Sequence, residues 1–111
     1  MKFQLLKAIV LFAFISTATA GALLDFFYAR SESEDVKLEW KTGEESNLQH
    51  FIIERRNPHS SFTQLATIQP LGSNKLYSYI DENAYKTNDL IFIYRLKIVD
   101  QDGSFEYSAV I

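Results

Sequence analysis

Two histidines are the first residues of this chain that could take part in chemistry. His50 and Glu54 are separated by an even number of positions, so an extended strand places both side chains on one face. A zinc site takes three or four ligands at matched spacing, and His59 lies apart from this pair in a segment of turn-forming residues. The pattern therefore predicts solvent-facing side chains and no metal site.

The segment Asp100-Gln101-Asp102-Gly103 resembles the start of a calcium-binding loop. Such a loop also needs a bidentate Glu at its twelfth position, which here is Ile111. The same residues are typical of a tight turn, because Gly103 can adopt the positive φ that a short hairpin requires. We expect a hairpin turn here and no calcium.

Acidic residues gather at Glu32, Glu34 and Asp35. Paired carboxylates perform acid–base chemistry when burial separates their pKa values. The polar residues around this cluster predict a solvated loop without such burial. Ser33 and the other serines lack a neighbouring arrangement of His and acid that would activate a nucleophile. The sequence thus predicts no catalytic residue, no metal and no cofactor, and we expect that the protein is not an enzyme.

Short strands are the elements that must position these residues. Apolar and polar residues alternate in several segments, and no segment keeps a helical period. Strands are expected over 23–29, 35–42, 51–56, 62–68, 76–80, 90–99 and 105–111. Loops are expected over 44–49, 57–61, 70–75 and 81–89. About seven strands at this spacing are typical of an all-β, antiparallel two-sheet sandwich.

Residues 1–20 have the pattern of a secretory signal peptide. A positively charged start precedes the apolar run from Ala8 to Ile15, and Ala18-Thr19-Ala20 supplies the small residues of a cleavage site. The run is shorter than the roughly 20 apolar residues of a bilayer span. We expect cleavage after Ala20, with no stable membrane span afterwards. Residues 21–111 would then form one domain, secreted or located in the periplasm or at the cell surface.

The amino-acid composition excludes one class of binding partner, nucleic acid. The chain has 14 acidic and 11 basic residues and a net charge of −3, and only Arg55 and Arg56 are adjacent basic residues. Nucleic-acid binding requires clustered Lys and Arg, so we exclude it. The absence of cysteine favours a bacterial exported protein, because small exported animal domains often carry disulfides.

The order of motifs resembles the fibronectin type III-like module of exported Bacteroidetes proteins, which is found next to type IX secretion sorting domains. The match runs through Leu24, Phe26, Ala29, Val36, Leu38, Trp40-x-Thr42-x-x-Glu45-x-Asn47, Phe51-Ile52-Ile53-Glu54-Arg55, Phe62, Tyr77-Ser78-Tyr79-x-Asp81, Tyr94-Arg95-Leu96-Lys97, Val99-Asp100-x-Asp102-Gly103 and Tyr107-Ser108. The resemblance covers nearly all of residues 21–111. It implies a fibronectin type III or immunoglobulin-like sandwich with a spacer or interaction role, and it supplies no catalytic residues.

The residues expected to build the core and its motifs follow from that pattern. They are Trp40, Phe51, Ile53, Tyr77, Tyr79, Tyr94, Leu96 and Gly103. Trp40 is expected to fill the space between the sheets. The hydroxyl of Tyr94 is expected to cap a backbone group, as in a tyrosine corner. Glu45 and Asn47 are expected to satisfy backbone donors in the loop after the second strand.

Two functions remain open from the sequence. The first is a non-catalytic interaction or spacer module of the cell envelope, whose partner is another envelope or secreted protein. The second is a small carbohydrate-binding domain. Phe26, Phe27 and Tyr28 are consecutive, so one or two of them must lie outside the core, where sugar rings can stack on them. A flat exposed patch containing Phe27, Tyr28 or Tyr107 would favour the glycan.

Overall fold

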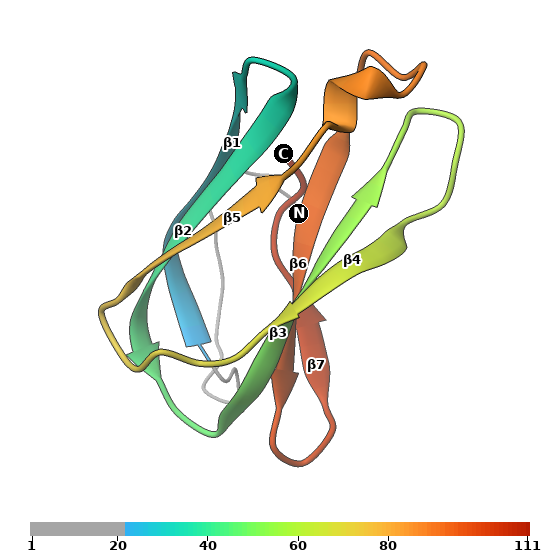
Figure 1. Ribbon diagram of the computed structural model, residues 1–111. Helices are drawn as coiled ribbons and strands as arrows, with labels where there is room; N and C mark the ends of the chain where they lie inside the picture. Colours follow the sequence, from blue (N-terminus) through green and yellow to red (C-terminus); the bar gives the residue numbers. More distant parts are fainter. Residues whose placement is uncertain (1–21) are drawn as a thin grey trace, which may run out of the picture.

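The computed structural model describes residues 22–111 as an all-β sandwich, which confirms the predicted fold class (Figure 1). The expected signal peptide lies outside these residues. One sheet has three strands in the order β1-β2-β5 and the other has four in the order β4-β3-β6-β7. All paired strands are antiparallel. Within the described range, no helix is long and apolar enough to cross a membrane.

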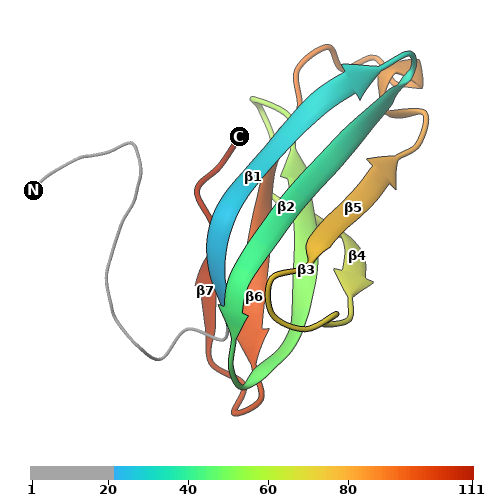
Figure 2. The ribbon, with the colours of Figure 1, turned by 90° about the vertical axis from the view of Figure 1, so that its left-hand side faces the viewer.

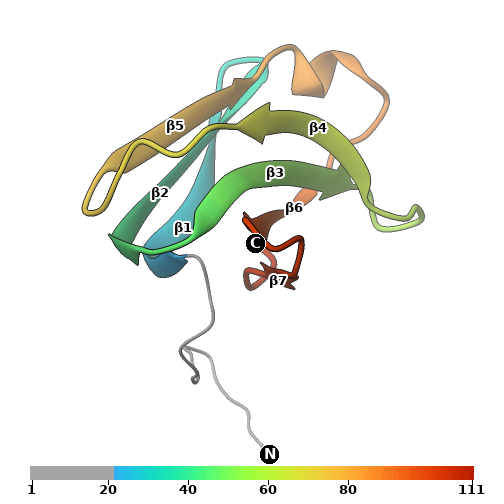
Figure 3. The same ribbon diagram turned by 90° about the horizontal axis from the view of Figure 1, so that it is seen from below.

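The strands carry the following bounds. The three-stranded sheet consists of β1 (Ala22–Glu32), β2 (Asp35–Glu45) and β5 (Leu76–Asp81). The four-stranded sheet consists of β4 (Thr63–Ile68), β3 (Leu48–Arg56), β6 (Ile93–Asp100) and β7 (Phe105–Tyr107). A short 3-10 helix, η1 (Ala84–Lys86), follows β5. In Figure 2, β1, β2 and β5 lie side by side in front of the four-stranded sheet, and Figure 3 shows the two layers from below.

Strand β2 illustrates how the sequence produces the sheet. Its residues alternate, so Val36, Leu38 and Trp40 are buried between the sheets while Lys37 and Glu39 lie on the outer face. The strand lies in the centre of its sheet, paired with β1 on one side and with β5 on the other. Each buried large side chain on this inner face contributes roughly 1.5–3 kcal/mol to folding.

The hairpin of β6 and β7 closes through the predicted turn. Gly103 has φ +89°, a conformation that side-chain-bearing residues rarely adopt, and its N–H donates to the Asp100 carbonyl at 3.0 Å. The prediction of one continuous strand over 105–111 is wrong, because β7 ends at Tyr107. Ser108 interrupts the ladder, since its hydroxyl oxygen accepts the Leu96 N–H at 2.8 Å. Pairing resumes at the end of the chain, where Ile111 and Tyr94 exchange two backbone hydrogen bonds of 3.0 Å.

Several other element boundaries differ from expectation, among them the end of β1, which extends to Glu32 instead of Ala29. The predicted loop over 44–49 is mostly strand, because β2 extends to Glu45 and β3 begins at Leu48. Asn47 makes this tight connection possible by adopting a left-handed conformation with φ 60°. The residues before Ile93 are not in a strand, so β6 begins later than the sequence suggested.

An aromatic cluster forms the centre of the core. The rings of Trp40 and Tyr77 stack with centroids 5.2 Å apart and planes inclined by 9°. Phe51 meets both of them edge-on, at 5.7 Å from Trp40 and 5.1 Å from Tyr77. These three rings come from β2, β5 and β3, so the cluster joins the two sheets.

The structure places the remaining predicted core residues around this cluster. Ile53 and Leu96 are fully buried, and Tyr94 is 2% exposed. Tyr79 is half-buried and packs against the core from its margin. Gly103 lies outside the core, in the hairpin turn already described.

Candidate functional site

An array of cationic and aromatic side chains lies on the outer face of the four-stranded sheet. The guanidinium of Arg95 is held between two rings, with its Cζ 3.7 Å from the centroid of Tyr107 and 4.0 Å from that of Phe62. Its Nε donates to Glu54 Oε1 at 2.7 Å. Arg95 is therefore fixed by three neighbours, two of which attract it through the negative faces of their rings.

Strand register explains why these groups meet. Lys97 pairs with Tyr107 and Val99 pairs with Phe105, so both rings stand on the same face as Arg95 and Lys97. The Lys97 ammonium lies 4.1 Å from the centroid of Phe105, and the rings of Phe105 and Tyr107 pack edge-on at 5.4 Å. The Cζ of Arg56 lies 5.3 Å from the centroid of Phe62. We call the set of Arg56, Phe62, Arg95, Lys97, Phe105 and Tyr107 the cation–aromatic face.

The cation–aromatic face has an excess of positive charge, although the chain as a whole is acidic with a net charge of −3. The charge of Arg95 is matched by Glu54. Over residues 22–111, neither Arg56 nor Lys97 forms an ion pair. Phe105 and Tyr107 are 49% and 45% exposed. The face thus presents exposed ring surface beside two cations that lack acidic partners in this part of the chain.

A second aromatic group lies on the outer face of the other sheet. The rings of Phe26 and Tyr28 stack with centroids 5.4 Å apart and planes inclined by 20°, and the two residues are 38% and 42% exposed. The Tyr28 hydroxyl donates to Glu39. This hydrogen bond is the main cause that raises the pKa of Tyr28 and lowers the pKa of Glu39.

The charges around Phe26 and Tyr28 neutralise one another. Lys37 Nζ is 3.6 Å from Glu39 Oε2, and Lys41 Nζ is 3.7 Å from Asp25 Oδ2. This sheet face therefore differs from the cation–aromatic face, because it offers rings without an excess of charge.

Phe27, Tyr28 and Tyr107, each of which was a candidate for a flat exposed patch, lie in three different places. Phe27 points inward and meets Trp40 edge-on at 6.2 Å. Tyr28 lies on the outer face of the three-stranded sheet, whereas Tyr107 lies on the outer face of the four-stranded sheet, against Arg95. Of the three, Phe27 is thus excluded from an exposed patch, Tyr28 stacks with Phe26, and Tyr107 belongs to the cation–aromatic face.

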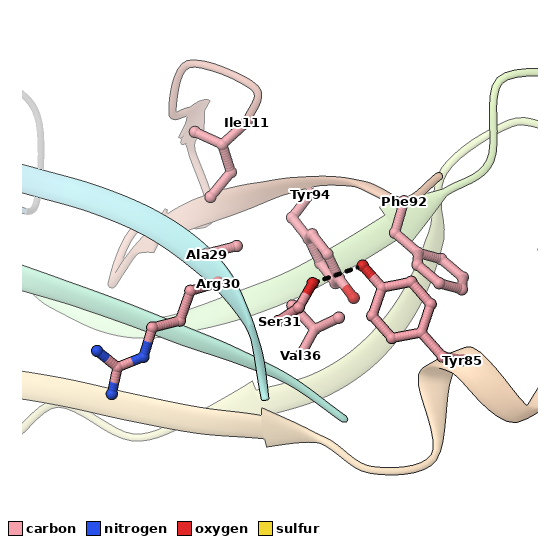
Figure 4. A pocket seen from close by; sticks show the side chains of 8 residues that line it. All are labelled: Ala29, Arg30, Ser31, Val36, Tyr85, Phe92, Tyr94 and Ile111. Atoms are coloured by element: carbon pink, nitrogen blue, oxygen red, sulfur yellow. Dashed lines mark hydrogen bonds between the residues drawn. The ribbon is translucent and has the colours of Figure 1, made fainter. Parts of the chain in front are cut away.

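A small cavity of about 190 Å³ opens at one end of the sandwich, between β1, η1 and β6 (Figure 4). Its wall includes the hydroxyls of Ser31 and Tyr85, which are hydrogen-bonded to each other at 2.9 Å. Arg30 extends away from the other lining side chains, so the cavity combines this hydroxyl pair with the apolar side chains of Val36, Phe92 and Ile111.

The hydroxyl of Tyr94 does not cap a backbone group, contrary to the sequence expectation. It donates to Asp81 Oδ2 at 2.6 Å, and Arg55 Nη1 donates to the same oxygen at 2.7 Å. Burial and then the hydrogen bond to Asp81 raise the pKa of Tyr94. Because Asp81 is 6% exposed, this carboxylate needs both donors to compensate for its lost hydration.

Tyr77 holds the backbone contact that was expected of Tyr94. Its hydroxyl accepts the Leu71 N–H at 2.6 Å and donates to Glu45 Oε2 at 2.6 Å. Burial and the hydrogen bond to Glu45 raise the pKa of Tyr77 to about 12. Glu45 also accepts the Gly72 N–H at 3.2 Å, so the backbone donor that it satisfies lies in the loop before β5 and not in the loop after β2. The contribution of Asn47 comes from its backbone, whose carbonyl accepts the Gln101 N–H at 2.8 Å.

The residues first considered for chemistry are dispersed. Glu54 binds Arg95, while His50 is half-buried on β3 and His59 is exposed in a turn. Asp102 accepts hydrogen bonds from the backbone and hydroxyl of Ser104, at 2.9 and 2.6 Å, as a turn residue does. In the described part of the chain, no three His, Cys, Asp or Glu side chains gather in a way that could hold a metal ion.

Of the acidic residues around the β1–β2 turn, Glu32 and Glu34 are exposed and Asp35 is half-buried, and each has a partner. Glu32 pairs with Arg30 at 2.8 Å, and Glu34 pairs with Lys86 at 3.4 Å. Asp35 accepts the backbone N–H of Asn83 at 2.8 Å. These contacts tie the turn to the segment after β5.

The cation–aromatic face was not predicted from the sequence. A signal was present, since Arg95 and Lys97 alternate with buried residues and Phe105 and Tyr107 follow a short turn. Pairing the residues on either side of that turn, one by one, would have given the register of the two strands. The position of Phe62 had no local signal, because it lies before β4 and is brought to Arg95 only by the sheet.

Comparison with protein-family models, with curated proteins and with solved structures found no match to this chain.

Proposed function

We propose that this protein is a non-catalytic interaction or spacer module, secreted or located at the cell envelope, that binds a partner protein through the cation–aromatic face. The observation that carries the proposal is the clamping of Arg95 between Phe62 and Tyr107, beside the exposed ring of Phe105. Arg, Tyr and Phe are enriched in the buried centres of protein interfaces, so this combination on a surface favours a protein partner.

Preorganisation supports binding at this face. An interface loses free energy when flexible side chains become ordered, by about 0.5–1.5 kcal/mol for each rotamer-rich side chain. Arg95 is already held by two rings and by Glu54 at 2.7 Å, so little of its freedom remains to be lost. Arg56 and Lys97 then select a partner whose contact surface carries carboxylates around an apolar centre.

Site-specific photo-crosslinking in the producing cells tests this proposal. A photoreactive benzoylphenylalanine replaces Phe105 on the cation–aromatic face, and in a matched control it replaces Phe26 on the opposite sheet. Both positions are exposed aromatics, so the change in chemistry is the same. We expect one protein to be captured from position 105, and its capture to be lost when Arg56→Glu and Lys97→Glu reverse the charges. Equal capture from both positions, or no capture from position 105, contradicts the proposal.

The alternative function is binding of a neutral glycan by Phe26 and Tyr28. The observation that favours it is the nearly parallel arrangement of these two exposed rings, on a sheet face whose charges are internally paired. Rings of this kind stack against the apolar faces of sugars without demanding a charge.

Affinity electrophoresis through gels that contain neutral polysaccharides tests the alternative. If Phe26 and Tyr28 bind glycan, the wild-type protein is retarded and the Phe26→Ala variant is not. Phe105→Ala, which removes another exposed phenylalanine ring from the other sheet, is the matched control and stays retarded. Unretarded migration of the wild type in every gel excludes this alternative.

A further inference from the structure

Among residues 22–111, strand β5 is an edge of the three-stranded sheet and has a strand on one side only. Figure 2 shows it at the margin of the front sheet, next to β2. The Thr42 N–H donates to the Lys75 carbonyl at 3.3 Å, so Thr42 and Lys75 form a hydrogen-bonded pair between β2 and the start of β5. Hydrogen-bonded pairs occur at every second residue of an antiparallel pair, so the N–H and C=O groups of Tyr77 and Tyr79 point to β2. The N–H and C=O groups of Leu76, Ser78 and Ile80 therefore point to the free edge.

The other edge strands carry features that oppose pairing with another chain. The register of β1 with β2 is irregular between Ala22 and Phe26. The register of β4 with β3 shifts next to Ile53, and β7 spans only Phe105–Tyr107. Irregular, short or bulged edges protect sheets from association.

Strand β5 has none of these features. Its register with β2 is unbroken from Leu76 to Asp81, and it contains neither Pro nor Gly. Its single charged residue, Asp81, stands at the end of the strand and is paired with Arg55. On the outer face, Leu76 and Ile80 are 55% and 36% exposed. An edge that is regular, apolar and exposed is a template for another strand.

The sequence of β5 is complementary to itself when it is reversed. From Lys75 to Asp81 it reads Lys-Leu-Tyr-Ser-Tyr-Ile-Asp, with Ser78 at its centre. In an antiparallel pair centred on Ser78, Leu76 lies opposite Ile80 on the outer face, and Tyr77 lies opposite Tyr79 on the inner face. Apolar and aromatic cross-strand pairs of this kind stabilise sheets.

We propose that two copies of this chain associate by antiparallel pairing of β5 with β5 about a two-fold axis at Ser78. The two three-stranded sheets then become one continuous sheet. Each of Leu76, Ser78 and Ile80 exchanges backbone hydrogen bonds with the second copy, which satisfies the groups at the free edge. The contact is isologous and closes on itself, so it stops at two copies. It uses none of the residues of the cation–aromatic face and is independent of the proposed function.

Disulfide trapping tests the geometry of this pair. The chain contains no cysteine, so Ser78→Cys introduces its only thiol. Residues on the two-fold axis of a hydrogen-bonded antiparallel pair have Cα atoms about 5.5 Å apart, within the range of disulfides. We expect Ser78→Cys to form covalent dimers on mild oxidation. Gln64→Cys, an exposed position on the edge strand β4, is the matched control and is expected to stay mostly monomeric. Equal yields for the two variants overturn the proposal.

The mass of the purified protein in solution is the second test. Light scattering over a range of concentrations is expected to give twice the mass of a single chain for the wild type and for Ser78→Thr. Ser78→Pro is expected to give the single-chain mass, because proline removes the N–H that points to the free edge and leaves the ladder with β2 intact. A monomeric wild type at every concentration, or a folded dimeric Ser78→Pro, overturns the proposal. Should Ser78→Pro fail to fold, the yields of the two cysteine variants decide.

Discussion

The indole of Trp40 lies flat against the phenol ring of Tyr77, with centroids 5.2 Å apart and planes inclined by 9°. The two residues come from neighbouring strands of one sheet, and Phe51 from the other sheet closes against both. This contact joins the two layers at the centre of the sandwich, and stability is expected to depend on it.

Replacing Trp40 by alanine is expected to lower the free energy of unfolding by about 3–5 kcal/mol, because a fully buried aromatic side chain leaves a cavity. Urea unfolding followed by far-ultraviolet circular dichroism measures the loss. Phe26→Ala is the control, and it should cost much less because Phe26 is 38% exposed. Similar losses for the two variants would show that Trp40 does not hold the core.

Replacing Tyr94 by phenylalanine is expected to cost about 1.5–3 kcal/mol, because it removes a hydrogen bond to the buried carboxylate of Asp81. Tyr85→Phe is the matched change, since the half-buried Tyr85 hydroxyl bonds a neutral group, the Ser31 hydroxyl, at 2.9 Å. It should cost about 1 kcal/mol or less. Urea unfolding of both variants tests the difference, and equal costs would contradict the role assigned to Asp81.

Stability is expected to fall as the pH rises from about 10 to about 12. The pKa of Tyr77 is raised to about 12 in the folded protein, whereas an unfolded tyrosine titrates near 10. Above pH 10 the unfolded chain therefore binds fewer protons than the folded chain, and stability decreases with pH. The contribution of Tyr77 is fully present below pH 10 and is lost as the pH passes through its folded value.

Urea midpoints measured at several alkaline pH values, for the wild type and for Tyr77→Phe, test this dependence. The variant lacks the titrating hydroxyl, so its stability should decline less steeply over the same range. Identical slopes would show that Tyr77 does not carry the effect, and would direct attention to Tyr94, whose pKa is also raised.

Replacing Arg95 by alanine is expected to cost about 1–2 kcal/mol, since it removes two ring contacts worth about 0.5–1 kcal/mol each and a partly exposed ion pair. Arg95→Lys should recover only part of this loss, because an ammonium cannot fill the flat space between two rings. Amide hydrogen exchange in β7 provides the local readout. Wild-type protection of β7 in Arg95→Ala would contradict the clamping of Tyr107.

Local pattern was sufficient to predict the strands and most of the core. Alternation in β2 identified Trp40 as an inward residue, and the Asp102-Gly103 turn identified the hairpin of β6 and β7. The end of β7 could not be predicted, because the break depends on the Ser108 hydroxyl taking the place of a backbone acceptor for Leu96. The backbone contact was assigned to Tyr94 instead of Tyr77 for a similar reason. Both are buried strand tyrosines, and only the path of the loop before β5 and the position of Asp81 decide which hydroxyl meets backbone.

The burial of Trp40 also determines what the intrinsic fluorescence of this protein can measure. It is the only tryptophan in the chain, it is fully buried, and its immediate ring neighbours are Phe27, Phe51 and Tyr77. Its emission should therefore be blue-shifted in the native state and should move to the red on unfolding. Ligands on either outer face do not touch the indole, so they leave this emission unchanged. The intrinsic fluorescence is a reporter of unfolding, and titrations with a partner need a dye attached at the surface.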